Sequence, residues 1–438
     1  MLTPTVRMWR SNSAPILVLI FFGSIGITLL LWGLIPGRYF DSSSWDYDYA
    51  YRPLSDTILA GHAFIWTGPG PAIQVPENAP ILKVRPGSAL VRFPPGYSII
   101  IAATRDIAGR LRIPESYGID ALNLVAVGIC AASLFAIASS VFGGWFALAV
   151  PGLWVTYPGL LFITRQPASE IPFCAFVFAA LAVVWPSIDT TSVGAVRWIT
   201  AGVLLGCAML VRAEGIGLSL ATGVIFVVLA RRAPLGIRLF RMAMVVLGSV
   251  VAVLPWEMWA YHHTSAVIPI ATSGPQSFCD GLTFAFDRDT RREKIELSAG
   301  LKELSLEFLD GCYKASSSTE AVAFLFTQAR RYPEQVFDLI MLKAARSWYA
   351  TNSGRADRKI LAIQLGYGVM FILATAVSMW WPGTPRVLAS IVWALVIYFW
   401  TMTIAVLSIL RYMVPAIGLL FLLAPAAFKT LARRSAAR

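Results

Sequence analysis

Three aspartates follow the first long apolar run, in the stretch DSSSWDYDYAYRP between residues 41 and 53. A carboxylate in an aromatic, partly dry interface suits general-base catalysis, because desolvation raises its pKa toward the working range. We therefore consider Asp48 first and Asp46 second as candidate bases, and interpret Asp41 as a solvated cap. The alternative is that all three are solvated loop charges. Their oxygens could also accept a divalent cation, the one cofactor that the sequence leaves open.

Basic residues recur at the same ends of the apolar runs as these aspartates. Arginine binds phosphate oxygens in a bidentate fashion, so the set favours a phosphate-bearing lipid headgroup as ligand. For any single residue the alternative is a side chain that snorkels from a helix end. The residues concerned are Arg52, Lys83, Arg85, Arg92, Arg105, Arg165, Arg212 and Arg411.

Two glutamates and three histidines lie at comparable positions. Glu170 and Glu214 each have an arginine nearby in the sequence, and we expect each to pair with that neighbour. The histidines are His62, His262 and His263. Two adjacent histidines on a helix do not face one metal ion, so no histidine metal site is predicted.

The elements that must position these residues are membrane-spanning helices. The chain has 438 residues, of which 57% are hydrophobic and 14% are charged. Apolar stretches of about 20 residues, the length needed to cross a bilayer, recur along it. We predict an all-α integral membrane protein with about ten transmembrane helices. The expected spans are 15–36, 119–142, 145–163, 171–188, 196–212, 214–230, 240–260, 360–381, 387–407 and 410–428.

Basic clusters at one side of these spans set the expected orientation. They contain Arg7, Arg10, Arg197, Arg231, Arg232, Arg238, Arg241, Arg386, Lys429, Arg433, Arg434 and Arg438. By the positive-inside rule this side is cytoplasmic, so we expect a multi-pass protein of the inner membrane whose candidate site faces the periplasm. The net charge of +12 then reflects topology, and nucleic acid is not an expected partner.

Two large segments, 37–118 and 261–359, are expected on the periplasmic side. We divide the chain into an N-terminal membrane domain (1–260, including the loop 37–118), a helical extracytoplasmic loop (261–359) and C-terminal transmembrane helices (360–438). In the first loop, RFPPGYSIIIAATRDIAGRLR is too short to cross a bilayer and predicts a juxtamembrane or re-entrant helix. The second loop has apolar residues at helical spacing, which indicates a helical cap. Cys279 and Cys312 both lie in it, and whether they form a disulfide stays open.

Several short motifs occur in a fixed order along nearly the whole chain. They are DYDYAYRPLSDTILAGHAF, RFPPGYSIIIAATRDIAG, LNLVAVGICAASLFAIASSVFGG, SEIPFCAFVFAALAVV, AGVLLGCAMLVRAEG, LPWEMWAYHHTSAVIPIATSGPQSF and LRYMVPAIGLLFLLAPAA. This series resembles the bacterial branch of the membrane-embedded GT-C glycosyltransferases, relatives of the protein O-mannosyltransferases and of the aminoarabinose transferase that acts on lipid A.

The resemblance implies an inverting transfer of a sugar from a polyprenyl-phosphate-linked donor to a glycan, lipid or protein acceptor at the outer face of the membrane. It implies that Asp48 or Asp46 deprotonates the acceptor hydroxyl. Fixed guanidinium groups would stabilise the charge that develops on the phosphate leaving group. We expect donor phosphate contacts from Arg92, Arg212, Arg411 and Arg165, and substrate contacts from Tyr51, Tyr97, Glu170 and His262.

Other classes of membrane protein compete with this interpretation. An O-antigen ligase or polymerase would also use polyprenyl-linked sugars and carry a large outer loop. A transporter or lipid flippase would commonly have ten spans, but its ionisable residues would lie near mid-membrane rather than at one surface. A noncatalytic protein of the same fold is the remaining alternative.

Overall fold

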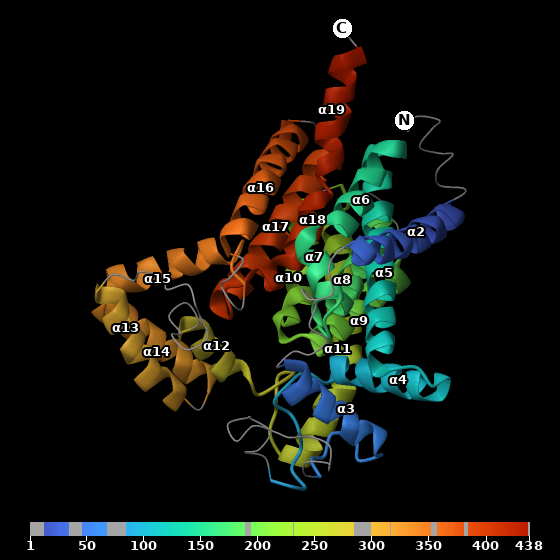
Figure 1. Cartoon of the computed structure of the whole chain (residues 1–438). Helices are drawn as coiled ribbons and strands as arrows, with labels where there is room; N and C mark the ends of the chain where they lie inside the picture. Colours follow the sequence, from blue (N-terminus) through green and yellow to red (C-terminus); the bar gives the residue numbers. More distant parts are fainter. Residues whose placement is uncertain are drawn as a thin grey trace.

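Helices account for nearly all of the described chain (Figure 1). The computed structural model describes residues 13–34, 46–67, 85–188, 194–230, 232–283, 299–315, 317–351, 357–380 and 384–436. Asp41 and Lys83 lie outside these ranges. The only strand-like pairing among the described residues is an isolated antiparallel bridge between Ile65 and Ala89. The predicted all-α class is therefore confirmed.

Seven helical segments of the described chain are long and apolar enough to cross a membrane. They are α2 (Ser13–Leu34), α5 (Glu115–Phe142), α8 (Glu170–Val184), α11 (Leu235–Thr264), α16 (Asp357–Trp380), α17 (Thr384–Ala405) and the stretch Leu410–Thr430, which contains η8 (Leu410–Met413), α18 (Val414–Phe421) and part of α19 (Ala424–Ala436). Such a set of apolar helices identifies a multi-pass membrane protein.

The other predicted spans are helical but broken or short. The span expected at 145–163 is a pair of helices, α6 (Ala149–Thr156) and α7 (Pro158–Thr164), bent by 55°. The break falls at Tyr157, which is extended (φ −67°, ψ 119°) because a proline follows it. The spans expected at 196–212 and 214–230 are α9 (Ala195–Val211) and α10 (Leu218–Leu229), with 17 and 12 residues. The count of ten spans stays a prediction.

The first loop contributes two helices at one end of the bundle. Helices α3 (Arg52–Leu59) and α4 (Pro95–Leu111) lie across the lower end of α5 in Figure 1. The Arg105 guanidinium ties them together: it lies 2.7 Å from an Asp56 oxygen and 3.1 Å from a Glu115 oxygen at the start of α5. We call this the loop end of the molecule.

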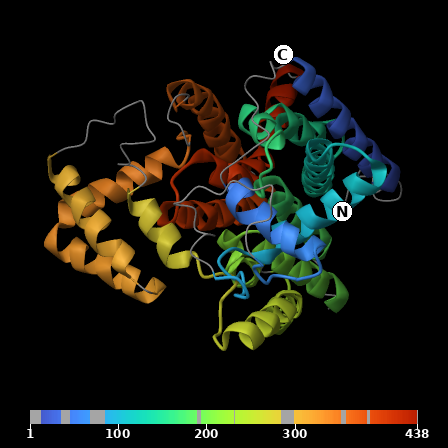
Figure 2. The ribbon, with the colours of Figure 1, turned by 60° about the horizontal axis from the view of Figure 1, so that its bottom comes forward.

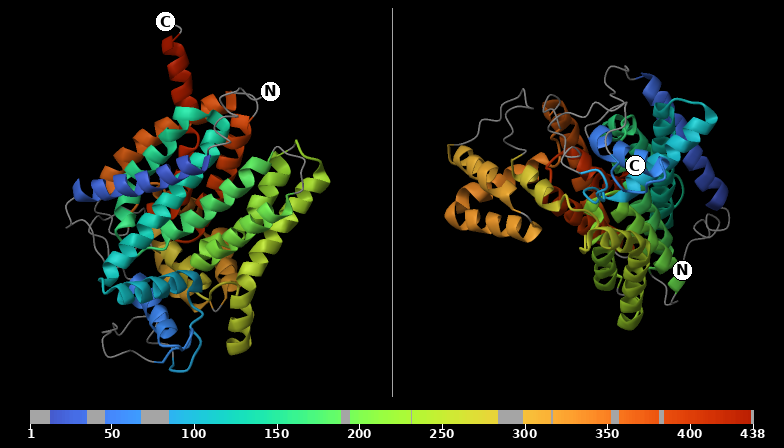
Figure 3. Two further views of the ribbon diagram at one scale, coloured as in Figure 1. Left: turned by 90° about the vertical axis from the view of Figure 1, so that its right-hand side faces the viewer. Right: turned by 90° about the horizontal axis from the view of Figure 1, so that it is seen from below.

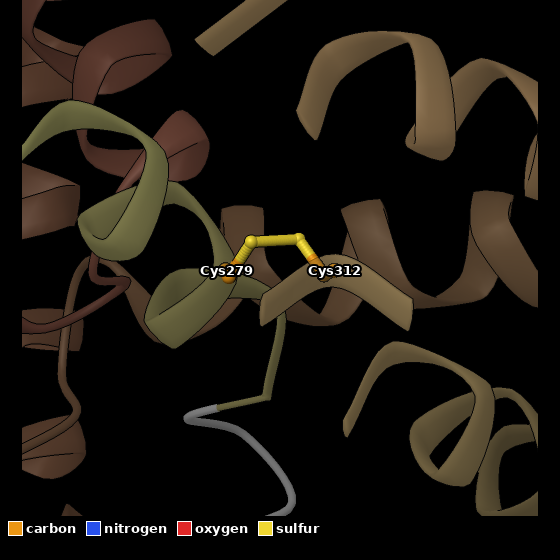
Figure 4. The surroundings of a disulfide bond; sticks show 2 residues. All are labelled: Cys279 and Cys312. Atoms are coloured by element: carbon orange, nitrogen blue, oxygen red, sulfur yellow. A yellow bond between two sulfur atoms is a disulfide. The ribbon is translucent and has the colours of Figure 1, made fainter. Parts of the chain in front are cut away.

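The second loop forms a separate helical layer, which we call the cap. It comprises α12 (Gly274–Thr283), α13 (Ala299–Gly311), α14 (Ser318–Arg331) and α15 (Pro333–Arg346), and it lies to one side of the spans in Figures 2 and 3. Its own core includes Leu304, Phe308 and Leu339. Cys279 and Cys312 form a disulfide with Cα atoms 5.6 Å apart, which joins α12 to the end of α13 (Figure 4). The pairing that the sequence left open is thus present.

A buried lysine fastens the cap to the last spans. Lys343 of α15 is 2% exposed, and its amine donates to the carbonyl oxygens of Gly281 at 2.6 Å and Val406 at 3.1 Å. A Cβ at Gly281 would lie 1.7 Å from the Val406 oxygen, so only glycine permits this approach. A neutral amine has the two N–H groups that the two carbonyls require.

The stability of the protein should rise with pH because of Lys343. Burial lowers the pKa of Lys343 to about 7, whereas an unfolded lysine titrates near 10.4, so between these values the unfolded chain binds one more proton. The unfolding free energy should increase from about pH 7 upward by up to about 1.4 kcal/mol per pH unit. Apparent Tm of detergent-solubilised protein across this range tests it, with Lys343→Met as the control that loses the slope. Parallel slopes for the two proteins would contradict the prediction.

Candidate active site

A cavity of about 500 Å³ opens at the loop end, between the first loop, the ends of spans and the cap. Three parts of the protein form the walls of this cavity, and each contributes polar side chains. The first loop provides Asp46, Tyr51, Arg92 and Phe93, the span ends provide Arg212, Glu214 and Tyr412, and the cap provides Gln276, Ser277, Asp280 and Ser318. Such a concave pocket with convergent polar groups is where a substrate site is expected.

Asp46 and Arg411 form an ion pair at the edge of this cavity. An Asp46 carboxylate oxygen lies 2.7 Å from the Arg411 guanidinium, and the two side chains are 39% and 22% exposed. Asp46 precedes the one-turn π-helix η2 (Tyr47–Tyr51), and Arg411 lies in η8 at the start of the last apolar stretch. The pair therefore joins the first loop to the final span.

A buried carboxylate connects Arg411 to a second arginine. Glu170, only 3% exposed at the start of α8, has one oxygen 2.9 Å from Arg212 and 3.4 Å from Arg411. Arg212 also donates to both oxygens of Glu214, at 3.0 and 2.8 Å, and to the Ser169 hydroxyl at 2.8 Å. Most of the N–H groups of Arg212 are thus used inside the protein.

The local sequence explains how Arg212 reaches this position. It is an extended residue (φ −145°, ψ 131°) between the end of α9 and the short turn η6 (Ala213–Gly215). Gly96, at the start of α4, packs against this end of α9: a Cβ there would lie 2.7 Å from the Leu210 backbone. Tyr398 of α17 donates to the Glu214 carbonyl at 3.0 Å and supports the turn from the other side.

Aromatic rings surround the charged groups. The ring of Tyr412 lies under both guanidinium groups, 4.7 Å from Arg212 and 5.2 Å from Arg411. Tyr51 packs edge-on against Tyr97, with ring centroids 4.9 Å apart. Tyr51 lines the cavity, whereas Tyr97 is completely buried behind it. Burial raises the pKa of Tyr51, so its phenol stays protonated at neutral pH.

The two candidate bases differ in position. Asp46 is among the described residues that line the cavity, and Asp48 is not. Side chains two residues apart in a helical turn do not share a face. Asp48 is half-buried and follows Tyr47, whose hydroxyl donates to Glu115 at the start of α5. Of the two, the geometry therefore favours Asp46.

Arg92 joins the first loop to the cap. Its guanidinium donates to the Gln276 side chain of α12, and backbone hydrogen bonds from Thr272 to Val91 and from Ser273 to Arg92 pair the two segments. Burial lowers the pKa of Arg92, and the negative charge of Asp280 acts in the opposite direction. Because an arginine remains protonated in proteins, Arg92 presents a positive charge to the cavity.

Two predicted site residues lie elsewhere. The Arg165 guanidinium is 5.3 Å from the ring of Trp32, on the α2 side of the bundle. His262 is exposed near the end of α11, where its ring lies 5.1 Å from that of His263. Neither is among the described residues that line the cavity. Asp48, the first candidate base, is not among these described lining residues either. The structure brings together the remaining predicted residues: Asp46, Tyr51, Arg92, Arg212 and Arg411 with Glu170, and Tyr97 directly behind Tyr51.

Glu214, Tyr412 and the residues of the cap wall belong to the site but were not predicted to act in it. Glu214 and Glu170 were expected to pair with a nearby arginine, and this is confirmed for Glu214 alone, since Glu170 pairs with Arg212 and Arg411 instead of Arg165. Tyr412 could have been suspected because it directly follows Arg411. Nothing in the sequence pattern indicated the cap wall.

The part of the chain that the structure describes contains no group of three or more His, Cys, Asp or Glu side chains arranged to hold a metal ion. Of the carboxylates that line the cavity, Asp46 and Glu214 each have an oxygen paired with an arginine, and so does the buried Glu170 behind them. Asp280 of α12 also lines the cavity.

Comparison with known proteins identifies the fold. No protein-family model matches the chain, and no curated protein matches it. Its structure is similar to that of the archaeal oligosaccharyltransferase AglB from Archaeoglobus fulgidus in complex with an inhibitory peptide and a dolichol-phosphate, with a TM-score of 0.53 and 13% sequence identity. The match covers 98% of this chain and 52% of that protein, so the chain spans about half of its length. The chain therefore shares the fold of part of that protein.

Proposed function

We propose that this protein is a glycosyltransferase that moves a sugar from a polyprenyl-phosphate-linked donor to an acceptor, with inversion at the anomeric carbon. The observation that carries the proposal is the Asp46–Arg411 ion pair at a cavity between membrane helices and a polar cap. The fold shared with an oligosaccharyltransferase that was solved with a dolichol-phosphate supports this substrate class.

The donor phosphate binds to Arg411 and Arg92 in this proposal. Arg92 lines the cavity, and Arg411 lies beside it through its ion pair with Asp46. Each of Arg411 and Arg212 is paired with two carboxylates, but Arg411 is 22% exposed, whereas Arg212 is 9% exposed. Guanidinium groups hold phosphate oxygens through paired N–H donors. Arg212 adds positive charge from behind and holds Glu170, which in turn orients Arg411.

Phosphate binding also prepares the base. The carboxylate of Asp46 accepts a hydrogen bond from Arg411 and so occupies one side of its guanidinium group. A phosphate that takes that place leaves Asp46 without its cationic partner, which makes the carboxylate a stronger base. Asp46 rather than Asp48 is therefore the residue that we assign to deprotonation.

The reaction then follows from these positions. The acceptor oxygen attacks the anomeric carbon while its proton moves to the carboxylate of Asp46. The bond between the anomeric carbon and the phosphate oxygen breaks, and polyprenyl phosphate leaves with the electron pair. Fixed guanidinium groups stabilise the charge that develops on that oxygen. Attack opposite the leaving group inverts the anomeric centre.

The remaining walls suit the sugar. Tyr51, Phe93 and Tyr412 offer ring faces, while hydroxyl, amide and carboxylate groups of α12 offer hydrogen bonds to sugar hydroxyls. The positive-inside rule places this cavity on the periplasmic side of the inner membrane. The acceptor is a glycan, a lipid or a protein of that compartment.

Glycan analysis in the cell and a solution assay test the proposal together. Deletion of the gene should remove one sugar from the mass of a surface glycan, and the natural chain should restore it. Purified protein in detergent, given a lipid extract with radiolabelled polyprenyl-phosphate sugars and cell-envelope acceptor, should form labelled product. A transporter or flippase would change the glycan in cells but form no product in detergent, where no compartments exist, and this result would overturn the proposal.

A further inference from the structure

Helix α15 of the cap has two apolar faces, and only one of them is covered by other described helices. Val336 and Leu339 are at most 4% exposed and belong to the core that α15 shares with α13 and α14. Phe337, Ile340 and Met341 are 62%, 40% and 53% exposed. Residues three and four apart share a helix face, so these three side chains form one apolar stripe.

The apolar stripe ends against a membrane-spanning helix. Ala344 follows Ile340 by four residues on the same face, and its carbonyl accepts a hydrogen bond of 3.0 Å from the Trp400 indole of α17. At the end of α15, Arg346 lies 3.3 Å from Asp357, the first residue of α16. With the Lys343 contact to Val406, these bonds fix α15 at the loop-end boundary of two spans.

The direction in which the apolar stripe faces follows from the position of α13 and α14, which cover the opposite face of α15. In Figure 1, α13 and α14 lie below α15, whereas the body of α16 rises above it. The stripe faces away from α13 and α14 and therefore toward the side on which α16 enters the membrane. Helix α16 carries apolar side chains that are exposed, among them Leu365, Val369 and Ile372. Arg358 and Lys359 are exposed at the start of α16, at the level expected for lipid phosphates.

We propose that the apolar stripe of α15 inserts into the lipid leaflet at the loop end, so that α15 anchors the cap to the bilayer surface. An amphipathic helix that lies in the interface buries its apolar face among the acyl chains close to the headgroups. Helix α15 is tied directly to the start of α16, whose exposed apolar side chains would face acyl chains, and this is why lipid, rather than a second protein, is the partner that we assign. This proposal does not depend on the transferase reaction.

Collision accessibility of spin labels tests the anchor. Cys130, Cys174 and Cys207 are replaced by Ala, the Cys279–Cys312 disulfide is kept, and a nitroxide is attached at Phe337→Cys, Ile340→Cys or Met341→Cys. The full chain is studied in nanodiscs of phosphatidylethanolamine and phosphatidylglycerol. We expect oxygen, which concentrates in the bilayer, to relax all three labels more than the water-soluble nickel chelate does.

The matched control is Leu306→Cys on α13, another apolar residue that is 58% exposed. There the chelate should dominate. A chelate-accessible label at 337, 340 and 341 would show that the stripe faces water, and labels reached by neither reagent would show that a protein surface covers it. Either result would overturn the proposal, and both can be read whether or not the protein transfers a sugar.

Discussion

The Asp46→Asn variant should insert into the membrane like the natural protein and lose transfer activity by about 10²–10⁴-fold. Asparagine has nearly the same shape and its amide oxygen can still accept from Arg411, but it cannot take the acceptor proton. Because the change also removes the anion that competes with phosphate for Arg411, the KM for the donor should not rise. The loss should therefore appear in kcat.

Asp48→Asn is the matched control, since it makes the same chemical change two residues away. It should retain activity close to that of the natural chain, because Asp48 is not among the described residues lining the cavity. The measurement is initial rate against donor concentration with both variants at equal amounts in detergent. Full activity of Asp46→Asn with loss of activity in Asp48→Asn would reverse the assignment.

Replacement of Arg212 should have the largest effect on folding. Arg212→Met leaves Glu170 and Glu214 buried without their principal counter-ion, and breaking a buried pair in this way costs about 3–5 kcal/mol. The yield of monodisperse protein after detergent extraction and its apparent Tm should both fall. Additional replacement of both glutamates by Gln should recover part of the loss, because it removes the unpaired charges.

Arg331→Met is the control for Arg212. Arg331 is 61% exposed, and its pair with Glu307 at 3.5 Å is worth about 0–1 kcal/mol in solvent. This variant should be as stable as the natural chain within about 1 kcal/mol. If Arg212→Met proved equally stable, the buried network would not hold the span ends together, and its place in the site would need another explanation.

The length of the apolar stretches in the sequence was sufficient to locate the helices but not the breaks within them. Each of the ten expected segments coincides with helix in the described residues, because burying backbone polar groups in lipid requires helical hydrogen bonds. Pro158 in the sequence indicates a break at Tyr157. We nevertheless predicted one continuous span at 145–163, because the whole segment is apolar. The observed fold is similar to that of an oligosaccharyltransferase, and the resemblance to GT-C enzymes stays a prediction because the motifs that carried it are individually short.

The site could be predicted only in part, because its contacts are long-range. Spacing brings Arg212 near Glu214 but says nothing of Glu170, which lies 42 residues earlier, or of Arg411. The choice between Asp46 and Asp48 depends on which side of a single helical turn faces the cavity. The sequence cannot make this choice, because both residues are aspartates with aromatic neighbours. Arg165 and His262 have side chains that could bind substrate, and both were expected at the ends of spans that carry the site. In the structure their side chains instead contact Trp32 and His263.

The Asp46–Arg411 pair spans 365 residues, from the first loop to the start of the last apolar stretch. Because a chain is made from its N-terminus, Asp46 exists long before Arg411 is translated. Until then Asp46 and the buried Glu170 lack one of their cationic partners. In the proposed mechanism the site is therefore completed only when the last apolar stretch is in place, and a chain that stops before residue 411 should be inactive.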